Sequence, residues 1–341
     1  MIENIKYVEM DGKRYLMPSH LQIEVVGGKG MCNAHCAMCT IDKWERPPTI
    51  MSDAVFQGIM DGIAPFNQHI EYVTLHGNGE PLLDKAMAGK VRYAKQKGFK
   101  GVGFATNCSA LTKKRADELI AAGLDTIICS IDGMKKETHE AIRPGTKFES
   151  VVRNVKYLIQ ARNRSGKTKI LVRFIRQEIN QHEFPEYKAY WDKYLNPEFG
   201  DEVLVFNIHN WGSQLDVGNQ INESFGHVHE EIPICADLYH RLLVFPNGDL
   251  AFCDADYNGF YDLGNVQKEH FLKLYNGERL NFYRQKMESG KIGELPYCKS
   301  CTIPISRANK AAPAGSDEKA PPASNASKVI PIVAMGEKLP L

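Results

Sequence analysis

Short apolar stretches alternate with amphipathic stretches along the first two thirds of the chain. The apolar stretches are rich in β-branched residues, which is typical of strands, and the stretches between them repeat apolar residues at helical spacing. Predicted strands lie at residues 21–26, 70–75, 101–105, 125–131, 169–175 and 202–206. Predicted helices lie at residues 53–63, 84–97, 112–122, 136–142, 150–162 and 182–193.

Six apolar strands separated by helices predict parallel strands joined by right-handed crossovers. The α/β pattern therefore indicates a partial (β/α)6 barrel, with a doubly wound sheet as the alternative. In such barrels the chemistry lies where the carboxyl ends of the strands lead into loops. Unusual polar residues follow several of the predicted strands at these ends, as in His76-Gly-Asn-Gly-Glu-Pro81 after the second strand.

The alternation stops at about residue 225. Residues 242–253 predict a β-hairpin across the turn 246–249, and a single helix is expected near 268–288. The first 20 residues predict a short β-rich lead-in, and the Ala-, Pro- and Ser-rich end of the chain is typical of a disordered tail. We therefore expect an N-terminal β extension (1–20), a barrel (21–222), a smaller cysteine-bearing domain (223–306) and a tail (307–341).

Composition narrows the classes of function. The formal net charge is +1, from 42 basic and 41 acidic residues, so no overall field favours nucleic acid or a membrane surface. No apolar stretch approaches the ~20 residues that span a bilayer, and no signal peptide begins the sequence, so we expect a cytoplasmic protein. Nine cysteines in a reducing compartment indicate metal ligands or catalytic thiols rather than disulfides.

Three cysteines, Cys32, Cys36 and Cys39, form a C-x3-C-x2-C motif. Three thiolates on one tight loop can hold three irons of a [4Fe–4S] cube and leave the fourth iron without a protein ligand. Because such clusters normally take four cysteines, another molecule is expected to bind the open iron. The alternatives are a zinc site or three unrelated buried thiols.

The motif resembles that of the radical SAM family, and the resemblance extends over about residues 21–210. It implies a partial (β/α)6 radical SAM barrel that binds S-adenosyl-L-methionine (SAM) through its amino and carboxylate groups at the open iron. It also implies that an electron from the cluster cleaves SAM to a 5′-deoxyadenosyl radical. No complete Rossmann fingerprint or Walker A motif supports a nicotinamide or P-loop alternative.

The resemblance also implies a set of SAM contacts. The Gly77–Pro81 segment is similar to the family's GGE segment, which holds the SAM amino group, with Asn78 in place of a small residue. Arg173 would pair with the SAM carboxylate, since a zwitterion needs both an anion and a cation. Met38 would lie near the adenine. The expected SAM contacts are Met38, Gly77, Asn78, Gly79, Glu80, Asn107, Ser130, Asp132 and Arg173. For each polar residue the alternative is an ordinary satisfied strand end.

Four further cysteines, Cys235, Cys253, Cys298 and Cys301, have the spacing C-x17-C-x44-C-x2-C. From the ligands alone they could bind Zn²⁺ or a second Fe–S cluster. Their segment resembles the twitch domain, the shortened form of the SPASM domain, and its spacing is similar to that of butirosin-pathway aminocyclitol dehydrogenases. The resemblance implies one auxiliary [4Fe–4S] cluster with all four irons ligated.

A fully ligated cluster suits the role of an electron acceptor. We therefore expect a radical SAM oxidoreductase that oxidises an alcohol carbon of a small polyol or aminocyclitol, with a flavodoxin- or ferredoxin-type reductant. A base must take the hydroxyl proton. The resemblance implies an arginine base from the last barrel segment, but no arginine lies between Gln177 and His240. His209 is therefore the candidate substitute, with packing or capping beside Trp211 as the alternative.

Three other functions stay open. Cys108 follows the third strand, where its thiol could return a hydrogen atom in a radical epimerisation. Modification of a ribosomal peptide, by thioether or cross-link formation, is a further possibility within the family. Only about 30 residues precede Cys32, too few for a leader-binding domain, which favours a small substrate. Outside the family, the chain would be a zinc-stabilised binding module.

Overall fold

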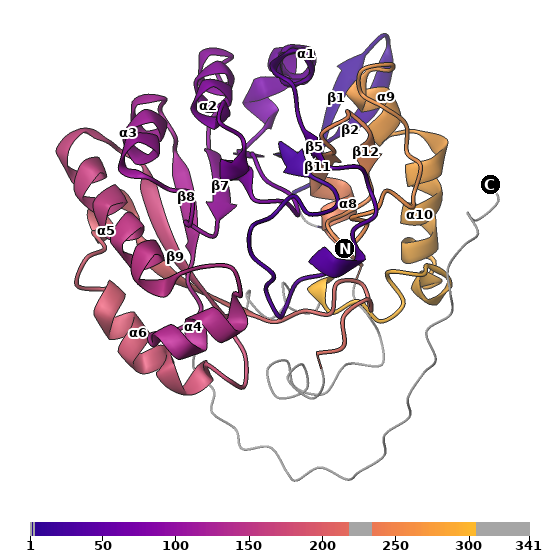
Figure 1. Cartoon of the computed structure of the whole chain (residues 1–341). Coiled ribbons are helices and arrows are strands. Elements are labelled where there is room, and N and C mark those ends of the chain that lie inside the picture. The colour runs from indigo at the N-terminus through magenta and orange to yellow at the C-terminus, as the bar shows by residue number, and fades with distance from the viewer. Residues whose placement is uncertain (1, 3, 218–233, 305–341) are drawn as a thin grey trace, which may run out of the picture.

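The fold is built on one mixed sheet that curves into a partial barrel (Figure 1). The structure, a computed structural model, describes residues 2, 4–217 and 234–304. Its main sheet has eight strands in the order β10-β9-β8-β7-β6-β3-β11-β12. The six predicted strands are present and pair in parallel: β3 (His20–Ile23), β6 (Tyr72–Thr74), β7 (Val102–Thr106), β8 (Thr126–Ser130), β9 (Lys169–Arg176) and β10 (Glu202–Asn207). The predicted α/β partial barrel is confirmed.

The register brings the carboxyl ends of neighbouring strands together. Thr106 at the end of β7 pairs with Cys129 of β8, and Ser130 at the end of β8 pairs with Arg173 of β9. Residues that alternate along a strand face opposite sides of a sheet. The barrel strands therefore place polar side chains on the inner face while their other face packs beneath the helices.

Helices cover the outer side of the barrel sheet (Figure 1). Ser52 and Thr112 cap the first and third helices by accepting hydrogen bonds from backbone N–H groups three residues on. The helices are α1 (Asp53–Ile63), α2 (Met87–Gln96), α3 (Lys113–Ala121), α4 (Lys136–Ile142), α5 (Phe148–Ser165) and α6 (Phe184–Trp191).

The predicted hairpin at residues 242–253 forms, but it belongs to the barrel sheet. β11 (Arg241–Val244) pairs in parallel with β3, and β12 (Leu250–Ala251) returns antiparallel to β11. A short helix, α8 (Asp237–His240), leads into β11. The cysteine-bearing region therefore extends the sheet of the barrel through direct strand pairing.

Two predicted elements were too long. The single helix expected at residues 268–288 is two helices, α9 (Phe271–Tyr275) and α10 (Glu278–Glu288). Gly277 breaks it by taking an extended conformation, with ψ of 162°, at the start of α10. The strand expected at residues 21–26 ends at Ile23, and β4 (Val26–Gly27) then pairs with β5 (Thr49–Ile50).

The N-terminal residues form a hairpin of β1 (Lys6–Met10) and β2 (Lys13–Met17). The hairpin is fastened to the cysteine-bearing region by Asn276, whose side chain accepts from Leu16 N at 2.7 Å and donates to Leu16 O at 3.0 Å. Among the described residues, no helix is long and apolar enough to cross a membrane. The tail expected at residues 307–341 lies outside the described residues.

Candidate active site

The loop between β4 and β5 carries Cys32, Cys36 and Cys39, all of them half-buried. The loop is folded tightly by its own backbone, because Cys39 N donates to Cys36 O at 2.9 Å. Ala34 N also points at Cys32 Sγ, at 3.5 Å. Backbone N–H groups directed at a sulfur stabilise a thiolate.

The same loop is docked on the segment that joins α4 to α5. His35 N donates to Pro144 O at 2.8 Å, and Ala37 N donates to Ile142 O at 2.9 Å. Gly145, with φ of 92°, lies so close to the loop that a Cβ there would collide with Asn33 O. The α4–α5 segment therefore supports the cysteine loop along its length.

Burial disfavours free thiolates in this loop. Desolvation raises the pKa of both Cys32 and Cys39 to about 12, and the positive charge of Arg143 only partly opposes the rise. Within residues 2, 4–217 and 234–304, no three His, Cys, Asp or Glu side chains come close enough together to hold a single metal ion. The donor set, three thiols on one loop, fits a [4Fe–4S] cluster that spreads its ligands over three irons.

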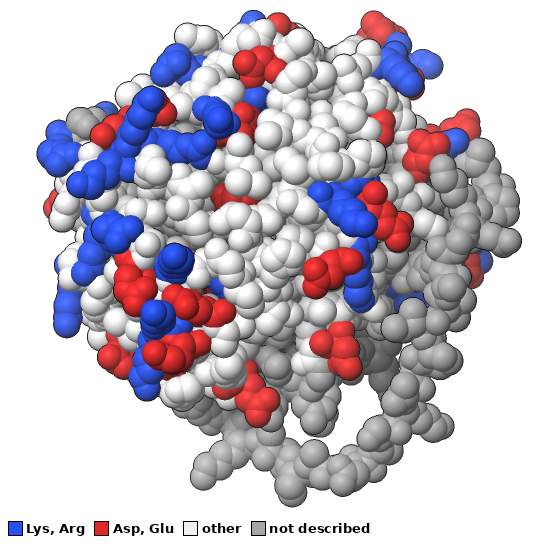
Figure 2. Space-filling view, in the orientation of Figure 1, with Lys and Arg blue, Asp and Glu red and all other residues white. Residues whose placement is uncertain are grey.

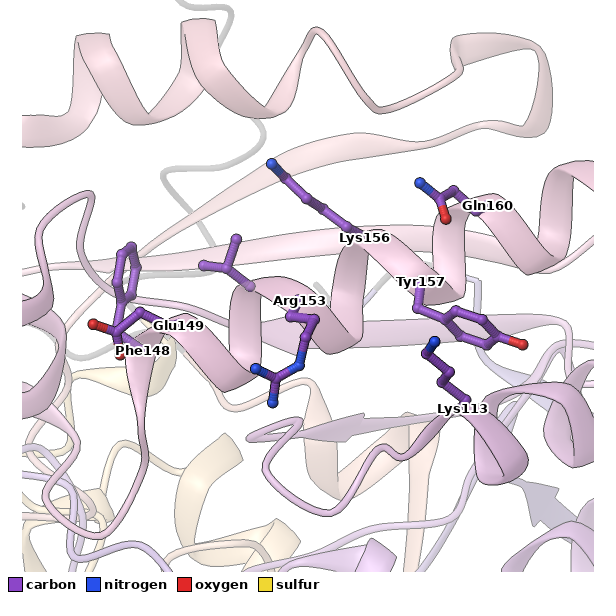
Figure 3. A pocket seen from close by; sticks show the side chains of 8 residues that line it. Lys113, Phe148, Glu149, Arg153, Lys156, Tyr157 and Gln160 are labelled. Atoms are coloured by element: carbon purple, nitrogen blue, oxygen red, sulfur yellow. The ribbon is translucent and has the colours of Figure 1, made fainter.

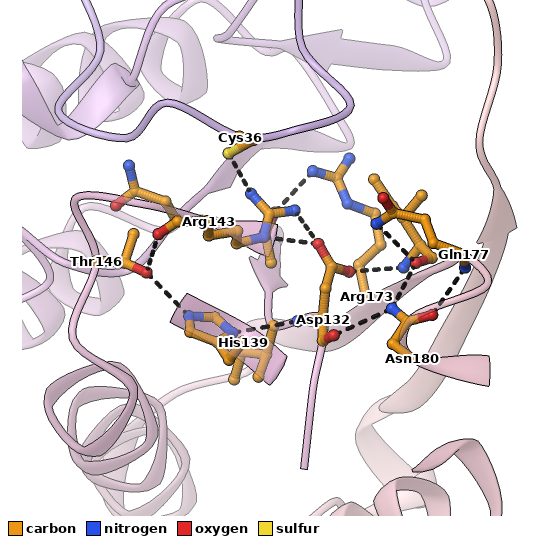
Figure 4. A network of polar contacts seen from close by, with 12 residues as sticks. Cys36, Asp132, His139, Arg143, Thr146, Arg173, Gln177 and Asn180 are labelled. Carbon is orange, nitrogen blue, oxygen red and sulfur yellow. Dashed lines mark hydrogen bonds and ion pairs between the residues drawn. The ribbon is translucent and has the colours of Figure 1, made fainter. Parts of the chain in front are cut away.

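Arg143 contacts this loop directly, and the sequence did not single it out. Its Nη1 donates to Cys36 Sγ at 3.3 Å, and its Nε and Nη2 bind Asp132 Oδ2 at 2.7 and 2.6 Å (Figure 4). The other oxygen of Asp132 accepts from Ile175 N at 2.6 Å. Asp132, expected among the SAM contacts, thus holds Arg143 against the cysteine loop.

Glu80 is buried, and three donors from two strand ends converge on it. Its Oε1 accepts from Thr106 Oγ1 at 2.7 Å and from Leu82 N at 3.0 Å, and its Oε2 accepts from Asn107 N at 2.9 Å. A carboxylate offers about four acceptor positions, so one stays open for a ligand. Burial raises the pKa of Glu80, and these hydrogen bonds oppose the rise. Glu80 therefore ties the loop after β6 to the end of β7.

The glycines of this loop leave no room for side chains. A Cβ on Gly79 would collide with Val26 O and lie 2.8 Å from Met31 O, and a Cβ on Gly77 would lie 2.8 Å from Glu24 Cβ. Asn78 N donates to Glu24 Oε1 at 3.0 Å. The loop after β6 is therefore packed directly against the start of the cysteine loop.

The end of β9 offers a partly satisfied cation. Arg173 Nη2 donates to Ser130 Oγ at 2.7 Å, but its buried Nε has no hydrogen-bond partner among the described residues. Burial, and then the like charge of Arg143, lower the pKa of Arg173. A carboxylate ligand would satisfy the free N–H and offset the repulsion, so this corner fits the carboxylate of SAM.

The other two expected SAM contacts lie beside the cysteine loop. Asn107 Nδ2 donates to Asn33 Oδ1 at 2.9 Å and lies 3.9 Å from Cys32 Sγ. Met38 is buried in a small apolar cluster with Ile142 and Ile208. The structure therefore brings the predicted residues from four strand ends around the three cysteines.

The four C-terminal cysteines, although far apart in sequence, line one pocket: Cys235, Cys253, Cys298 and Cys301. Burial raises the pKa of the Cys253 and Cys298 thiols, and the neighbouring cysteines add to the rise. A cationic cluster core would relieve both effects, and four thiols around one cavity fit a four-cysteine cluster. The ligation of an auxiliary cluster by these four cysteines stays a prediction.

A polar cluster inside the barrel, around Asp254, was missed by the sequence reasoning. Gln22 Nε2 donates to Asp254 Oδ1 at 2.8 Å and to His76 O at 3.1 Å, and Arg241 Nη1 binds Asp254 Oδ2. Asp254 directly follows Cys253, and its side chain keeps 25% of its surface exposed. Arg241 precedes the hairpin turn, and Asp254 follows it by the same number of residues. Their opposite charges at these positions are a sequence signal that could have identified the pair.

The two expected catalytic residues differ in access. Cys108 is completely buried, with φ of 60°, and its Sγ lies 3.7 Å from Thr106 O. Cys129 of β8 is also fully buried. His209 is half-buried: its Nδ1 accepts from Trp211 N at 3.3 Å, and the two rings lie 4.7 Å apart.

A second hollow lies on the outer helical surface, away from these residues. It has a volume of about 470 Å³ and is lined by residues of α3 and α5, among them Lys113, Arg153 and Tyr157 (Figure 3). Acidic and basic side chains are interspersed over the molecular face seen in Figure 2. The hollow between α3 and α5 contains none of the residues that the sequence placed in the site.

Sequence comparison finds two family matches in the chain. Residues 30–178 match the radical SAM superfamily, and residues 235–302 match SPASM, an iron-sulfur cluster-binding domain. A tungsten-containing aldehyde ferredoxin oxidoreductase cofactor-modifying protein of Pyrococcus furiosus is 26% identical over 316 residues, 80% of this chain and 85% of the relative. Mycofactocin maturase MftC of Mycolicibacterium smegmatis is 29% identical over 191 residues, 56% of this chain and 45% of that protein.

Solved structures share the fold at low identity. BtrN in complex with AdoMet and 2-DOIA has a TM-score of 0.56 at 18% identity, with 84% of this chain and 93% of BtrN covered. SuiB of Streptococcus suis, bound to its precursor peptide SuiA, has a TM-score of 0.61 at 13% identity, with 86% and 71% covered. With the three-cysteine loop, the four-cysteine pocket and both sequence matches, the chain belongs to the radical SAM superfamily and carries a C-terminal SPASM domain.

Proposed function

We propose that this radical SAM enzyme removes two electrons from an alcohol carbon of a small polyol or aminocyclitol. The observation that carries the proposal is the position of Asp254, an ionised carboxylate inside the barrel, one residue from Cys253 of the four-cysteine pocket. A proton acceptor and an electron acceptor beside one substrate are what the second half of an alcohol oxidation requires. The barrel (21–222) and the cysteine-bearing domain (223–306) would thus share one site.

The proposed ligand sets follow the geometry. Cys32, Cys36 and Cys39 would hold the cluster that binds SAM, and the four-cysteine pocket would hold the auxiliary [4Fe–4S] cluster. When bound, the first cluster and SAM supply a radical that takes one hydrogen atom from the substrate carbon. Arg173 would bind the SAM carboxylate, and the open acceptor position of Glu80 would face the ammonium.

Asp254 would take the hydroxyl proton. Burial alone would raise its pKa, but the Arg241 guanidinium and the hydrogen bond from Gln22 hold its pKa below the ordinary value. The carboxylate is therefore ionised at neutral pH. One hydrogen atom, one proton to Asp254 and one electron to the auxiliary cluster together convert the alcohol to a carbonyl. His209 is the second candidate for the proton, since imidazole side chains commonly act as proton acceptors in catalysis.

The polar lining of the barrel supports a hydroxylated substrate. Gln22, His76 and Arg241 offer donors and acceptors on the inner face, which suit hydroxyl and amino groups. The likeness to BtrN, whose structure holds AdoMet and 2-DOIA, supports the same class. A flavodoxin- or ferredoxin-type protein would supply the electron for SAM cleavage.

Peptide modification is the second candidate. The similarity to mycofactocin maturase MftC, and the fold shared with SuiB in complex with its precursor peptide, favour it. Epimerisation by Cys108 is less favoured, because a hydrogen donor must reach the substrate and this thiol is completely buried. Alcohol oxidation and peptide modification differ in substrate but would use the same two clusters.

The first experiment is anaerobic reconstitution with iron and sulfide, counted per chain. We expect about eight irons in the unaltered chain, about four in a Cys32/Cys36/Cys39→Ala variant and about four in a Cys235/Cys253/Cys298/Cys301→Ser variant, since each cluster holds four. Only the first variant should lose SAM cleavage to 5′-deoxyadenosine.

Four irons in the unaltered chain, with zinc bound to the C-terminal cysteines, would remove the electron acceptor and with it the proposed oxidation. No iron or sulfide at all would leave the zinc-stabilised binding module. If eight irons are present, incubation with a panel of aminocyclitols and polyols should yield a carbonyl product. A modified precursor peptide instead would establish the second candidate.

A further inference from the structure

We propose that Arg143 sets the reduction potential of the cluster held by Cys32, Cys36 and Cys39, an inference that rests on the cluster assignment in the proposed function. Arg143 would act as a positioning and tuning residue, because its guanidinium touches a ligand sulfur. Its role would be to make the cluster reducible by a cellular electron donor.

The geometry places a fixed cation on one ligand. Arg143 Nη1 lies 3.3 Å from Cys36 Sγ, within hydrogen-bond distance for sulfur. Its side chain is only 6% exposed, so water screens its charge weakly. Its Nε and Nη2 are both held by Asp132 Oδ2, so the guanidinium is fixed against the cysteine loop.

A cation at this position favours the reduced cluster. Reduction adds one negative charge, and both the net charge nearby and hydrogen bonds to the sulfurs set the potential of an Fe–S cluster. Arg143 supplies a positive charge and a hydrogen bond at once. Asn107, a second side chain close to a ligand sulfur, is neutral and lies 3.9 Å from Cys32 Sγ.

Asp132 holds the guanidinium in place and offsets part of its charge. The carboxylate binds Arg143 at 2.6 and 2.7 Å, and it is completely buried. Its backbone N donates to His139 Nδ1 at 3.3 Å, and Thr146 joins His139 Nε2 at 3.0 Å to Arg143 O at 2.8 Å (Figure 4). The arginine is thus restrained at its side chain and at its backbone.

The test is a redox titration of the reconstituted full-length chain without SAM, using titanium(III) citrate and following the cluster by electron paramagnetic resonance. The relevant signal is the one absent from the Cys32/Cys36/Cys39→Ala variant. In Arg143→Met the equilibrium constant for one-electron reduction should fall at least tenfold, a midpoint lower by about 59 mV. Arg143→Lys, which keeps the charge, should lie between Arg143→Met and the unaltered chain.

Asp132→Asn separates tuning from simple structural damage. It removes the charge that offsets Arg143, so its midpoint should move upward, opposite to that of Arg143→Met. Arg153→Gln is the matched control, because it removes an exposed arginine of α5 and should leave the midpoint unchanged. Iron per chain is measured for every variant, so that incomplete loading is not mistaken for a shift.

Unchanged midpoints, or shifts of Arg143→Met and Asp132→Asn in the same direction, would overturn the inference. If Arg143→Met assembles no cluster, Arg143→Lys takes its place in the comparison. The midpoint of Arg143→Lys must then fall while that of Asp132→Asn rises. If the Cys32/Cys36/Cys39→Ala variant loses none of the signals of the unaltered chain, the cluster assignment itself is refuted. The two failures are therefore distinguishable.

Discussion

Asp254 illustrates how one residue can connect two parts of the site. Its carboxylate faces Gln22 of β3 and Arg241 of β11, while its backbone continues from Cys253 of the four-cysteine pocket. A proton acceptor at this place is within one residue of the proposed electron acceptor. Loss of its charge should therefore affect the oxidation but not the generation of the radical.

For Asp254→Asn we expect product formation to fall by about 10²–10⁴-fold, the usual contribution of a positioned base. The formation of 5′-deoxyadenosine from SAM without substrate should persist. The measurement is liquid chromatography of the oxidised product from reactions with substrate and of 5′-deoxyadenosine from reactions without it. Asp249→Asn, in the turn of the same hairpin, is the control and should retain both activities. Full product formation by Asp254→Asn, with loss in His209→Gln, would assign the proton to His209.

Two buried histidines predict a dependence of stability on pH. Burial lowers the pKa of His139 to about 3 and that of His76 to about 4, so both are neutral when folded. The unfolded chain binds their protons near pH 6.5. Stability is therefore fully present above pH 6.5 and is lost as the pH falls, by about 1.4 kcal/mol per pH unit for each histidine.

The measurement is urea unfolding of the cluster-free chain between pH 7 and pH 5. His139→Gln is expected to be less stable at pH 7, because two buried hydrogen bonds are disturbed. Its stability should also depend less steeply on pH than that of the unaltered chain. Parallel pH dependences of the two proteins would contradict the neutral state of His139.

At the scale of elements, the loop after β6 packs against the start of the cysteine loop. Gly79 lies directly against Val26 O, and Glu80 N donates to Met31 O at 2.9 Å. The geometry of the three thiols therefore depends on a glycine that touches none of them. A side chain at Gly79 would displace the start of the cysteine loop.

Gly79→Ala should lower the free energy of unfolding by about 1–3 kcal/mol, the usual cost of overpacking, and reduce the iron retained on Cys32, Cys36 and Cys39. Gly89→Ala is the matched control, because a Cβ at Gly89 in α2 meets no atom within 4 Å. It should stabilise the chain by about 0.5–1 kcal/mol. Iron analysis and urea unfolding of both variants test this, and equal iron contents would contradict the proposed contact.

The sequence predicted elements better than side-chain roles. The spacing of apolar residues was enough to predict the six strands and the helices α1 to α6. Ser52 and Thr112 also marked the starts of two helices, because an N-cap is a local signal. The split at Gly277 was missed because a helical period persists across it. The ion pair of Asp132 with Arg143, 11 residues away, could not be predicted, because it forms only in the folded chain. The pairing of β11 with β3 also could not be predicted, because a local sequence pattern does not show which strands are neighbours.

For the whole molecule, the shared sheet predicts cooperative unfolding. β11 continues the barrel through its pairing with β3, and Asn276 fastens the N-terminal hairpin to α9. The barrel and the cysteine-bearing region cannot separate without exposing an unpaired edge of β3 and of β11. The barrel and the cysteine-bearing region should therefore unfold together.

Calorimetry of the cluster-free chain should show one transition, with equal calorimetric and van't Hoff enthalpies. Substitution of Asn276 by Ala should lower the midpoint of that single transition. Two resolved transitions, only one of which moves in Asn276→Ala, would show that the two regions are independent units despite the common sheet.

The pairing of β3 with β11 also governs the order in which the newly made chain can fold. His20 and Arg241 are neighbours in the sheet but are separated by most of the barrel sequence. At about 5–20 residues per second, a ribosome needs roughly ten to forty seconds to travel between them. During that time one edge of β3 has no strand beside it, and an open edge is a template for pairing with other chains. Slower growth at low temperature, or a chaperone that shields this edge, should therefore raise the yield of folded protein.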